Sequence, residues 1–156
     1  MQSQQPDFMT LYEAWKRLKP GPRAELRRVS VPEGLLEVPA FYRLISNLVQ
    51  DTQARNAIHR LQRLVFCLPF ITHTDKEISL GTALAGGGSH GKSAVSDKRL
   101  FQMIRSEPPN DLIQLRRILK MVEPSLHWPL AARLLWYWNE RGKRQLLEDY
   151  FLNQPR

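Results

Sequence analysis

The stretch from Asp111 to Leu152, DLIQLRRILKMVEPSLHWPLAARLLWYWNERGKRQLLEDYFL, contains three of the chain's four tryptophans and predicts two consecutive helices. Up to Val122, apolar residues recur at spacings of three and four, which places them on one side of a helix. Pro124 ends this helix. Pro129 fits the first turn of the next helix, where its missing N–H loses no hydrogen bond. The spacing and the prolines therefore predict a helical hairpin.

The same stretch predicts a core and a basic surface. In the second helix Leu130, Leu134 and Trp138 recur every fourth residue, with Ala131 and Leu135 beside them and Trp136 close by, and we expect this side to anchor a core. On the first helix Arg116 and Arg117 fall away from the apolar side. Three further cations gather toward the far end of the second helix: Arg141, Lys143 and Arg144. A helix dipole favours cations in a last turn, so it explains part of that clustering without a ligand.

Length and charge limit the class of protein. The 156 residues fit one compact domain, or two small helical lobes, and are few for a multidomain enzyme. Lysine and arginine number 23 against 15 acidic residues, so the net charge is +8. This excess predicts a polyanionic partner, first nucleic acid and second an anionic membrane surface.

The sequence gives no support for a membrane or secreted location. No stretch approaches the roughly 20 apolar residues of a spanning helix, and the first residues, MQSQQPDF, lack a secretory pattern. The single cysteine, Cys67, cannot form an internal disulfide, which agrees with a reducing compartment. We therefore expect a cytoplasmic protein with no membrane partner.

The remaining chain predicts further helices between proline and glycine breaks. We expect helices to begin at Asp7, Pro22 and Pro39, near Asp51, and at Ser96 or Asp97, with Asn110 or Asp111 capping the helix that follows. On the helix after Ser96, we expect Leu100, Phe101 and Ile104 to face the core. Strand patterns of useful length are absent from the sequence, so the prediction is an all-α bundle of about eight helices.

A single helical unit spanning residues 1–156 could also divide into lobes. The alternative is an N-terminal lobe at 7–84, a glycine-rich surface loop at 85–96 and a C-terminal lobe at 97–152.

The glycine-rich loop contains one nucleotide-binding pattern. Residues 86–93, GGGSHGKS, match the phosphate-binding sequence GxxxxGK[ST], in which Lys92 would contact the outer phosphate and Ser93 would hold magnesium. That loop requires a buried strand before it, and ISLGTALA at 78–85 is a poor strand. We favour a surface loop, and a nucleoside triphosphatase is the alternative.

Basic clusters are the strongest functional feature. The histidines and Cys67 lack metal-ligand spacing, and no carboxylate pair suggests acid–base chemistry, so we expect no catalysis, metal or cofactor. A single cation on a helix is usually only solvated, but cations from several helices with few acids beside them predict phosphate contacts. Only one of the adjacent Arg27 and Arg28 can lie deep against the core. The candidate nucleic-acid-binding residues are Arg27, Arg28, Lys98, Arg99, Arg105, Arg116, Arg117, Arg141, Lys143 and Arg144.

Six runs in order along nearly the whole chain resemble one family. They are LYEAWKRL (11–18), ELRRVSVPEGLLEVPAFYRLI (25–45), RLVFCL (63–68), ISLGTALA (78–85), KRLFQMIRSEPPNDLIQLRRILKMVEP (98–124) and HWPLAARLLWYWNERGKRQLLEDYFL (127–152). The combination of RRVS, PAFYRL, QLRR and WPL is similar to the CasB family, the small subunits of the type I-E CRISPR surveillance complex Cascade.

The resemblance implies an all-helical, non-catalytic subunit, present in two copies, that helps to hold an R-loop. Its implied partners are crRNA, both strands of the target DNA, other Cascade subunits and a second copy of itself. In such complexes base pairing reads the sequence, and the protein contacts the backbones. Family-like basic positions are Arg27, Arg99, Arg105, Arg116, Arg117, Lys143 and Arg144.

Two further arginines in matched runs have a different expectation. Arg43 and Arg133 lie in segments that resemble core, so we expect an internal salt bridge or an inter-subunit contact. The loop at 86–93 departs from the family pattern, which leaves the role of Lys92 open. A structural adaptor that does not itself bind nucleic acid is the remaining alternative.

Overall fold

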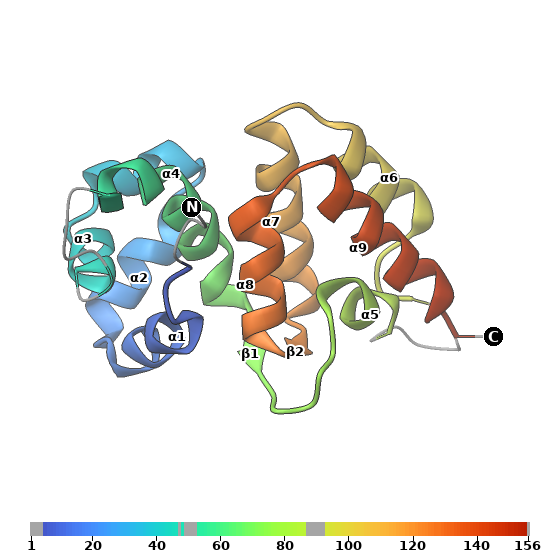
Figure 1. Cartoon of the computed structure of the whole chain (residues 1–156), viewed down its shortest axis with the longest axis horizontal. Coiled ribbons are helices and arrows are strands. Elements are labelled where there is room, and N and C mark those ends of the chain that lie inside the picture. Colours follow the sequence, from blue (N-terminus) through green and yellow to red (C-terminus); the bar gives the residue numbers. More distant parts are fainter. Residues whose placement is uncertain (1–4, 47, 49–52, 87–92, 156) are drawn as a thin grey trace.

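The computed structural model describes residues 5–46, 48, 53–86 and 93–155, and it confirms the all-α prediction (Figure 1). The α-helices are α1 (Phe8–Arg17), α2 (Pro20–Arg28), α3 (Pro39–Ile45), α4 (Gln53–Cys67), α5 (Leu80–Ala85), α6 (Asp97–Arg105), α7 (Asn110–Val122), α8 (Trp128–Tyr137) and α9 (Glu140–Leu152). Two 3-10 helices are η1 (Pro32–Glu37) and η2 (Leu68–Phe70). Two short parallel strands, β1 (Thr72–His73) and β2 (Ser125–Leu126), pair with Thr72 opposite Ser125.

Side-chain caps and prolines define most helix starts. The Asp7 carboxylate accepts a hydrogen bond from the Met9 N–H at 3.0 Å, and the Ser96 hydroxyl accepts one from the Arg99 N–H at 3.2 Å, so both predicted caps are confirmed. Pro39 opens α3 as predicted, whereas α2 begins at Pro20 and not at Pro22. The cap predicted near Asp51 lies outside the described residues.

The predicted caps of α7 are wrong. Pro109 occupies the N-cap position, and Asp111 lies inside the helix with no exposed surface. The helix ends as predicted before Pro124: Glu123 adopts a left-handed conformation with φ of 47°, and its N–H donates to the Leu119 carbonyl at 2.7 Å.

The single second helix predicted from Pro129 onward is in fact two helices. The chain breaks at Trp138 and Asn139, and the Asn139 side chain starts α9 by accepting a hydrogen bond from the Gly142 N–H at 2.8 Å. Arg141, Lys143 and Arg144 therefore lie near the N-terminal end of α9, not in a last turn. The helix dipole opposes cations there, so the dipole explanation is wrong.

The buried stripe of α8 also differs from the prediction. Ala131 and Leu135 are fully buried, and Leu134 and Trp138 are half-buried and pack against the core as predicted. Leu130 is 40% exposed, and Trp128 is fully buried in its place. Because α8 is apolar on most sides, spacing alone could not identify the stripe that packs against α1 and α4.

A smaller correction applies to α6. Leu100 and Met103 are fully buried, and Ile104 is half-buried and packs against the core as predicted, whereas Phe101 is half-buried outside the core cluster. The buried stripe of α6 is therefore narrower than predicted.

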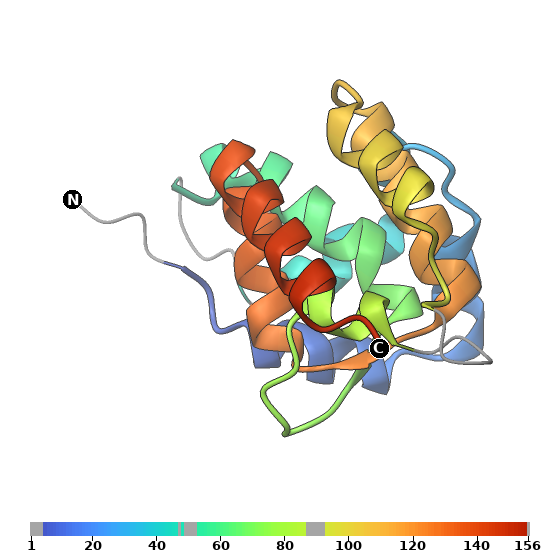
Figure 2. The same cartoon turned by 90° about the vertical axis from the view of Figure 1, so that its right-hand side faces the viewer.

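Buried apolar residues from every α-helix of the described chain form one cluster. In Figure 1, α1–α4 lie on one side and α5, α6 and α9 on the other, with α7 and α8 between them. The rotated view shows α6 beside α7 and α5 against α9 (Figure 2). Helix α5 thus packs on the C-terminal elements, although the two-lobe alternative places it in the N-terminal lobe. The division into lobes stays a prediction.

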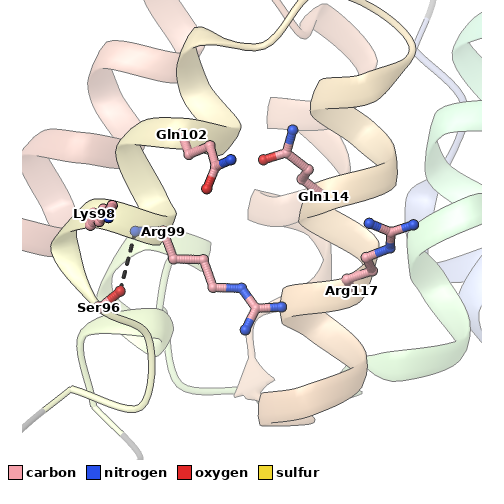
Figure 3. Close-up of a pocket in the computed structure, with 6 residues that line it drawn as sticks. All are labelled: Ser96, Lys98, Arg99, Gln102, Gln114 and Arg117. Carbon is pink, nitrogen blue, oxygen red and sulfur yellow. Dashed lines mark hydrogen bonds between the residues drawn. The ribbon is translucent and has the colours of Figure 1, made fainter.

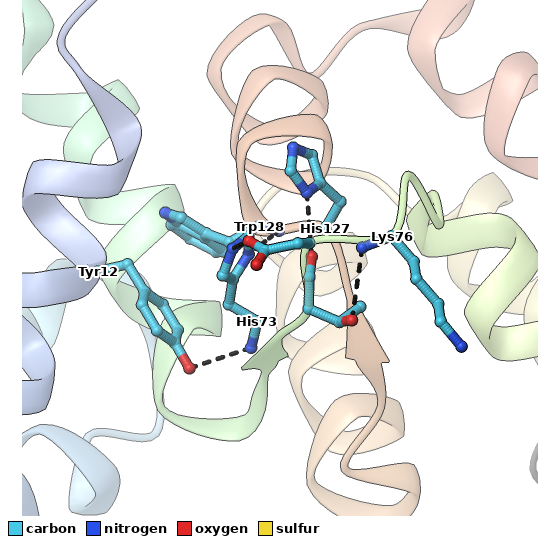
Figure 4. A network of polar contacts seen from close by, with 7 residues as sticks. Tyr12, His73, Lys76, His127 and Trp128 are labelled. Carbon is cyan, nitrogen blue, oxygen red and sulfur yellow. Dashed lines mark hydrogen bonds and ion pairs between the residues drawn. The ribbon is translucent and has the colours of Figure 1, made fainter.

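A polar network joins α1, the strand pair and the start of α8 (Figure 4). The backbone N–H of His73 donates to the Tyr12 hydroxyl at 3.0 Å, and the Trp128 N–H donates to Nδ1 of His73 at 3.1 Å. Nδ1 of His127 lies 3.0 Å from the Thr74 carbonyl oxygen. The Trp128 indole N–H extends the link by donating to the Phe8 carbonyl at 2.8 Å.

Among the described helices, none has the length and apolar character needed to cross a membrane.

Candidate nucleic-acid interface

A polar pocket between α6 and α7 collects three of the predicted cations. We call it the α6–α7 pocket, and it is lined by Ser96, Lys98, Arg99, Gln102, Gln114 and Arg117. Arg99 extends from α6 toward α7, and Gln102 and Gln114 face each other across the hollow (Figure 3). Arg117 lies farther along α7, with its guanidinium directed away from α6 in this view.

The α6–α7 pocket is cationic and lacks a lining carboxylate. Lys98, Arg99 and Arg117 are exposed, and none of them forms an ion pair within the described part of the chain. Among the described residues, the guanidinium of Arg99 donates a hydrogen bond to the Met121 sulfur, at 3.5 Å, and to no other side chain. Three cations with no anionic partner, beside two amide side chains, are suited to phosphate and sugar oxygens.

Arg105 lines two hollows beside this pocket, and the first of them shares Lys98 and Gln102 with it. With Lys98, Phe101, Gln102 and Ser106 it lines a second hollow on α6. It also lines a third hollow with Lys143 and Arg144, and there the carboxylates of Glu107, Asp111 and Glu140 lie among the cations. The guanidinium of Arg105 lies 5.2 Å from the centre of the Phe101 ring. The cations of α6 thus form a band that leads toward the start of α9.

Arg116 does not point away from the core as predicted. Only 7% of it is exposed, and its guanidinium donates to the Arg27 carbonyl at 2.6 Å and to the Leu26 carbonyl at 3.3 Å. The same group lies 4.4 Å from the centre of the Phe66 ring and 5.2 Å from that of Phe70. Burial lowers the pKa of Arg116 from its ordinary value.

Lys143 is held by a buried carboxylate. Its ammonium lies 2.8 Å from Asp111 Oδ2, which also accepts the Trp138 indole N–H at 2.8 Å. The other oxygen, Oδ1, accepts the Leu112 N–H at 2.7 Å. Asp111 has no exposed surface, so this network joins the starts of α7 and α9 to the end of α8.

The other predicted site residues occupy separate positions. Arg27 and Arg28 are both exposed at the C-terminal end of α2, so neither lies deep against the core. Arg141 is exposed at the start of α9. Arg144 is exposed and lies 3.6 Å from the exposed Glu140, four residues earlier. None of Arg27, Arg28 and Arg141 lines the three hollows.

Charge counting overlooked the uncharged members of the pocket. Gln114 and Ser96 line it beside the cations. Gln114 lies three residues before Arg117 on α7, and this spacing on a helix places them near each other. That spacing was the available signal, and charge alone did not reveal it.

The structure gives little context for nucleotide binding or metal chemistry. Helix α5, and not a strand, leads into the glycine-rich pattern, and the Ser93 hydroxyl donates to the Ala85 carbonyl at 2.6 Å. Residues 87–92, with Lys92, lie outside the described part.

Burial raises the pKa of Cys67 to about 12, which keeps the thiol protonated at neutral pH. No cluster of three or more metal-ligand side chains occurs among the residues described.

Comparisons with known proteins match nearly the whole chain to one family. A family model described as CRISPR-associated protein Cse2 matches residues 22–151. The CRISPR system Cascade subunit CasB of Escherichia coli strain K12 is 45% identical, over 94% of this chain and 93% of that protein.

Two solved structures have a similar fold. A chain in the crystal structure of E. coli Cascade bound to a PAM-containing double-stranded DNA target matches with a TM-score of 0.85 and 43% identity, covering 96% of this chain and 97% of that chain. CasB from Thermus thermophilus matches with a TM-score of 0.67 at 14% identity, over 94% and 99% of the two chains, a likeness in fold alone.

Proposed function

The chain belongs to the CRISPR-associated Cse2 family, and on this premise we propose that it is a non-catalytic subunit of a type I-E Cascade complex. In this role it binds nucleic acid without reading its sequence and stabilises the R-loop formed by crRNA and target DNA. Its partners are then crRNA, both DNA strands, the other subunits and a second copy of the chain. The cytoplasm is the compartment in which such a complex meets its target.

The main support for this proposal is the set of exposed cations that line the α6–α7 pocket. Lys98, Arg99 and Arg117 are exposed and lack a carboxylate partner in the described chain. Neutralising phosphates with such groups releases counterions, which supplies affinity for any sequence. Gln102 and Gln114 can donate to phosphate or sugar oxygens, which fixes orientation without base recognition.

The buried and paired cations have a different role in this proposal. Arg116 and Lys143 are engaged by backbone carbonyls and by Asp111, so we assign both to positioning within the protein. Arg105 extends the binding surface from the pocket toward α9. Arg27, Arg28, Arg141 and Arg144 are exposed and complete the set of phosphate-binding candidates.

Other exposed residues suit contacts with neighbouring subunits. Arg43 and Arg133 are exposed, and neither forms an internal salt bridge within the described residues. On α8, Arg133 is flanked by Leu130 and Tyr137, which are 40% and 39% exposed. An arginine among apolar side chains is typical of a protein–protein interface. We assign this face of α8 to subunit contact.

Binding of the full chain to labelled single-stranded DNA, duplex DNA and RNA across a salt series tests the proposal. We expect affinity that falls steeply with salt and is the same for unrelated sequences. In the wild type each phosphate contact contributes about 0.7 to 0.9 to the log–log salt slope. Arg117→Ala should therefore make the slope shallower by the amount that one phosphate contact contributes. The double change Lys98→Ala, Arg99→Ala should make it shallower by about twice that amount.

Arg43→Ala is the matched control, because it removes an exposed arginine on α3, at the opposite side of the molecule from α6. Its slope should equal that of the wild type. Absence of binding at low salt would instead favour a structural adaptor. Affinity that depends on ATP and magnesium would favour the nucleoside triphosphatase.

A further inference from the structure

We infer that Arg116 is a positioning residue that clamps the C-terminal end of α2 to α7 and so places Arg27 and Arg28 on the same binding surface as Arg117. The inference rests on the proposed nucleic-acid binding. It concerns how two clusters from distant parts of the sequence become one site.

The clamp uses groups that a helix end leaves unpaired. The last four carbonyls of an α-helix have no intrahelical partner, and Leu26 and Arg27 supply two of these in α2. The Arg116 guanidinium accommodates both, at 3.3 Å and 2.6 Å. A cation at this end is also favoured by the helix dipole. Arg116 is therefore the C-terminal cap of α2, supplied from a helix about 90 residues later in the chain.

The surroundings of Arg116 require a guanidinium. Its planar group contacts the Phe66 and Phe70 rings while its N–H groups donate to the carbonyls. A lysine ammonium is a compact, strongly hydrated charge that cannot stack in this way. Within the described residues Arg116 has no carboxylate partner, so its alignment depends on the carbonyls and the rings. An arginine keeps its charge even when buried.

The clamp determines where three exposed arginines lie. Consecutive residues of a helix point about 100° apart, so Arg117 is exposed where Arg116 is buried. Arg116 bonds directly to the backbone of Arg27, which precedes Arg28 at the end of α2. Arg27 also lies 5.8 Å from the centre of the Trp15 ring, which limits its freedom. The Arg116 side chain is thus a direct link between the end of α2 and the helix that carries Arg117.

A double-mutant cycle on the full chain tests the clamp. In the wild type, the pair of changes Arg27→Ala and Arg28→Ala should make the salt slope shallower by about 1.5, at about 0.7 to 0.9 per contact. Arg116→Lys keeps the charge and loses the clamp. In that background the same pair of changes should shift the slope by less than half as much. Arg117→Ala should keep its full effect in both backgrounds.

Trp128→Phe controls for a loss of stability alone. It removes the indole hydrogen bond to Phe8, away from Arg116. Binding is measured at a temperature at which circular dichroism shows each variant folded. In the Trp128→Phe background the pair of changes on α2 should retain its wild-type effect. If it does not, the loss in Arg116→Lys reflects stability, and the positioning role is overturned.

A second measurement, titration of a short labelled single-stranded DNA with the protein, needs no substitution at Arg116. If the arginines form one continuous surface, the DNA binds with one-to-one stoichiometry, and the changes on α2 and on α7 weaken the same binding event. Two independent binding events, each sensitive to one cluster, would overturn the inference. An equal effect of the α2 changes in wild type and Arg116→Lys would also overturn it, while Arg117→Ala still weakens binding. If Arg117→Ala has no effect at all, the proposed function itself fails.

Discussion

Arg116 and Arg117 are adjacent in sequence and have opposite environments, because the helix turns about 100° between them. Arg116 is buried against Phe66 and Phe70, whereas Arg117 is exposed in a pocket without carboxylates. Lys143 resembles Arg116 and not Arg117, since its ammonium is engaged within the protein, 2.8 Å from a carboxylate oxygen of Asp111. The role of a cation in this protein therefore depends on burial and on its partner more than on residue type.

Asp111→Asn should lower the free energy of unfolding by about 3 kcal/mol, because it leaves the buried ammonium of Lys143 without its anion. Urea denaturation followed by circular dichroism measures the loss. Lys143→Met combined with Asp111→Asn should cost less than the sum of the two single changes, since they share one interaction.

Arg144→Ala provides the comparison for Asp111→Asn. Arg144 and Glu140 are both exposed and 3.6 Å apart, so removing this pair should change stability by less than about 0.5 kcal/mol. If Asp111→Asn proved as mild as Arg144→Ala, the buried network would not hold the start of α9.

Cys67 should make the protein less stable at alkaline pH. Burial raises the pKa of the folded thiol from its ordinary 9.0 to about 12. Between these values the unfolded state has released its proton and the folded state has not. Stability therefore falls as the pH rises above about 9, by up to about 1.4 kcal/mol per pH unit.

Urea denaturation of wild type and Cys67→Ala between pH 9 and pH 10.5 measures this contribution. Other groups titrate in the same range, so the difference between the two proteins is the relevant quantity. The variant should lose stability less steeply, by about 1 kcal/mol per pH unit. Parallel curves would show that the thiol ionises equally in both states.

At the scale of the elements, the start of α9 concentrates cations where the helix dipole disfavours them. Asp111 compensates Lys143, and Glu140 lies beside Arg144. Arg141 is exposed and has no carboxylate within ion-pair distance among the described residues. A phosphate would relieve this unfavourable arrangement, which is consistent with a binding role for the cations that remain free.

Gly81→Ala should disrupt the packing of α5 on α9. A Cβ at Gly81 would lie 2.8 Å from the Asp149 Cβ and would also clash with the Leu146 carbonyl oxygen. Because backbone and not a flexible side chain is in the way, we expect a loss of about 1 to 3 kcal/mol. Gly21→Ala on α2, with no atom within 4 Å, should leave stability unchanged or raise it by up to about 1 kcal/mol. Thermal melts of both variants measure the contrast, and equal melting temperatures would contradict the close contact.

Local signals predicted most helix boundaries, because Pro39, Pro124 and Pro129 act through their own covalent geometry. The break at Asn139 was missed, since an apolar run and a basic run continue across it. Burial depends on neighbours distant in sequence. The basic pair at 116–117 could therefore predict cations on α7 and not that one of them caps α2. Lys98, Arg99 and Arg117 were identified as candidates, but only the fold brings them together in one pocket.

At the scale of the whole molecule, Lys98, Arg99 and Arg117 gather in one pocket while other exposed cations, such as Arg43 and Arg133, lie elsewhere. The apolar residues of all described α-helices share one core. A pocket lined by cations and by no carboxylate, as the α6–α7 pocket is, raises the local concentration of a polyanion and accelerates its association. Under the proposed function, the +8 net charge serves binding as well as solubility.

The shared core predicts that the chain unfolds as one unit, and not as separate lobes at 7–84 and 97–152. Trp128 of α8 donates to the Phe8 carbonyl of α1, and Arg116 of α7 donates to carbonyls of α2, so both halves lose buried contacts if either opens. We expect a single urea transition that coincides for tryptophan fluorescence and far-ultraviolet circular dichroism. Trp15 of α1 reports on the first segment and Trp138, which donates to Asp111 of α7, on the second. Variants that retain one or the other as the main fluorophore should give the same midpoint. Two midpoints separated along the urea axis would show independent lobes and would place the α2–α7 clamp at the boundary that opens first.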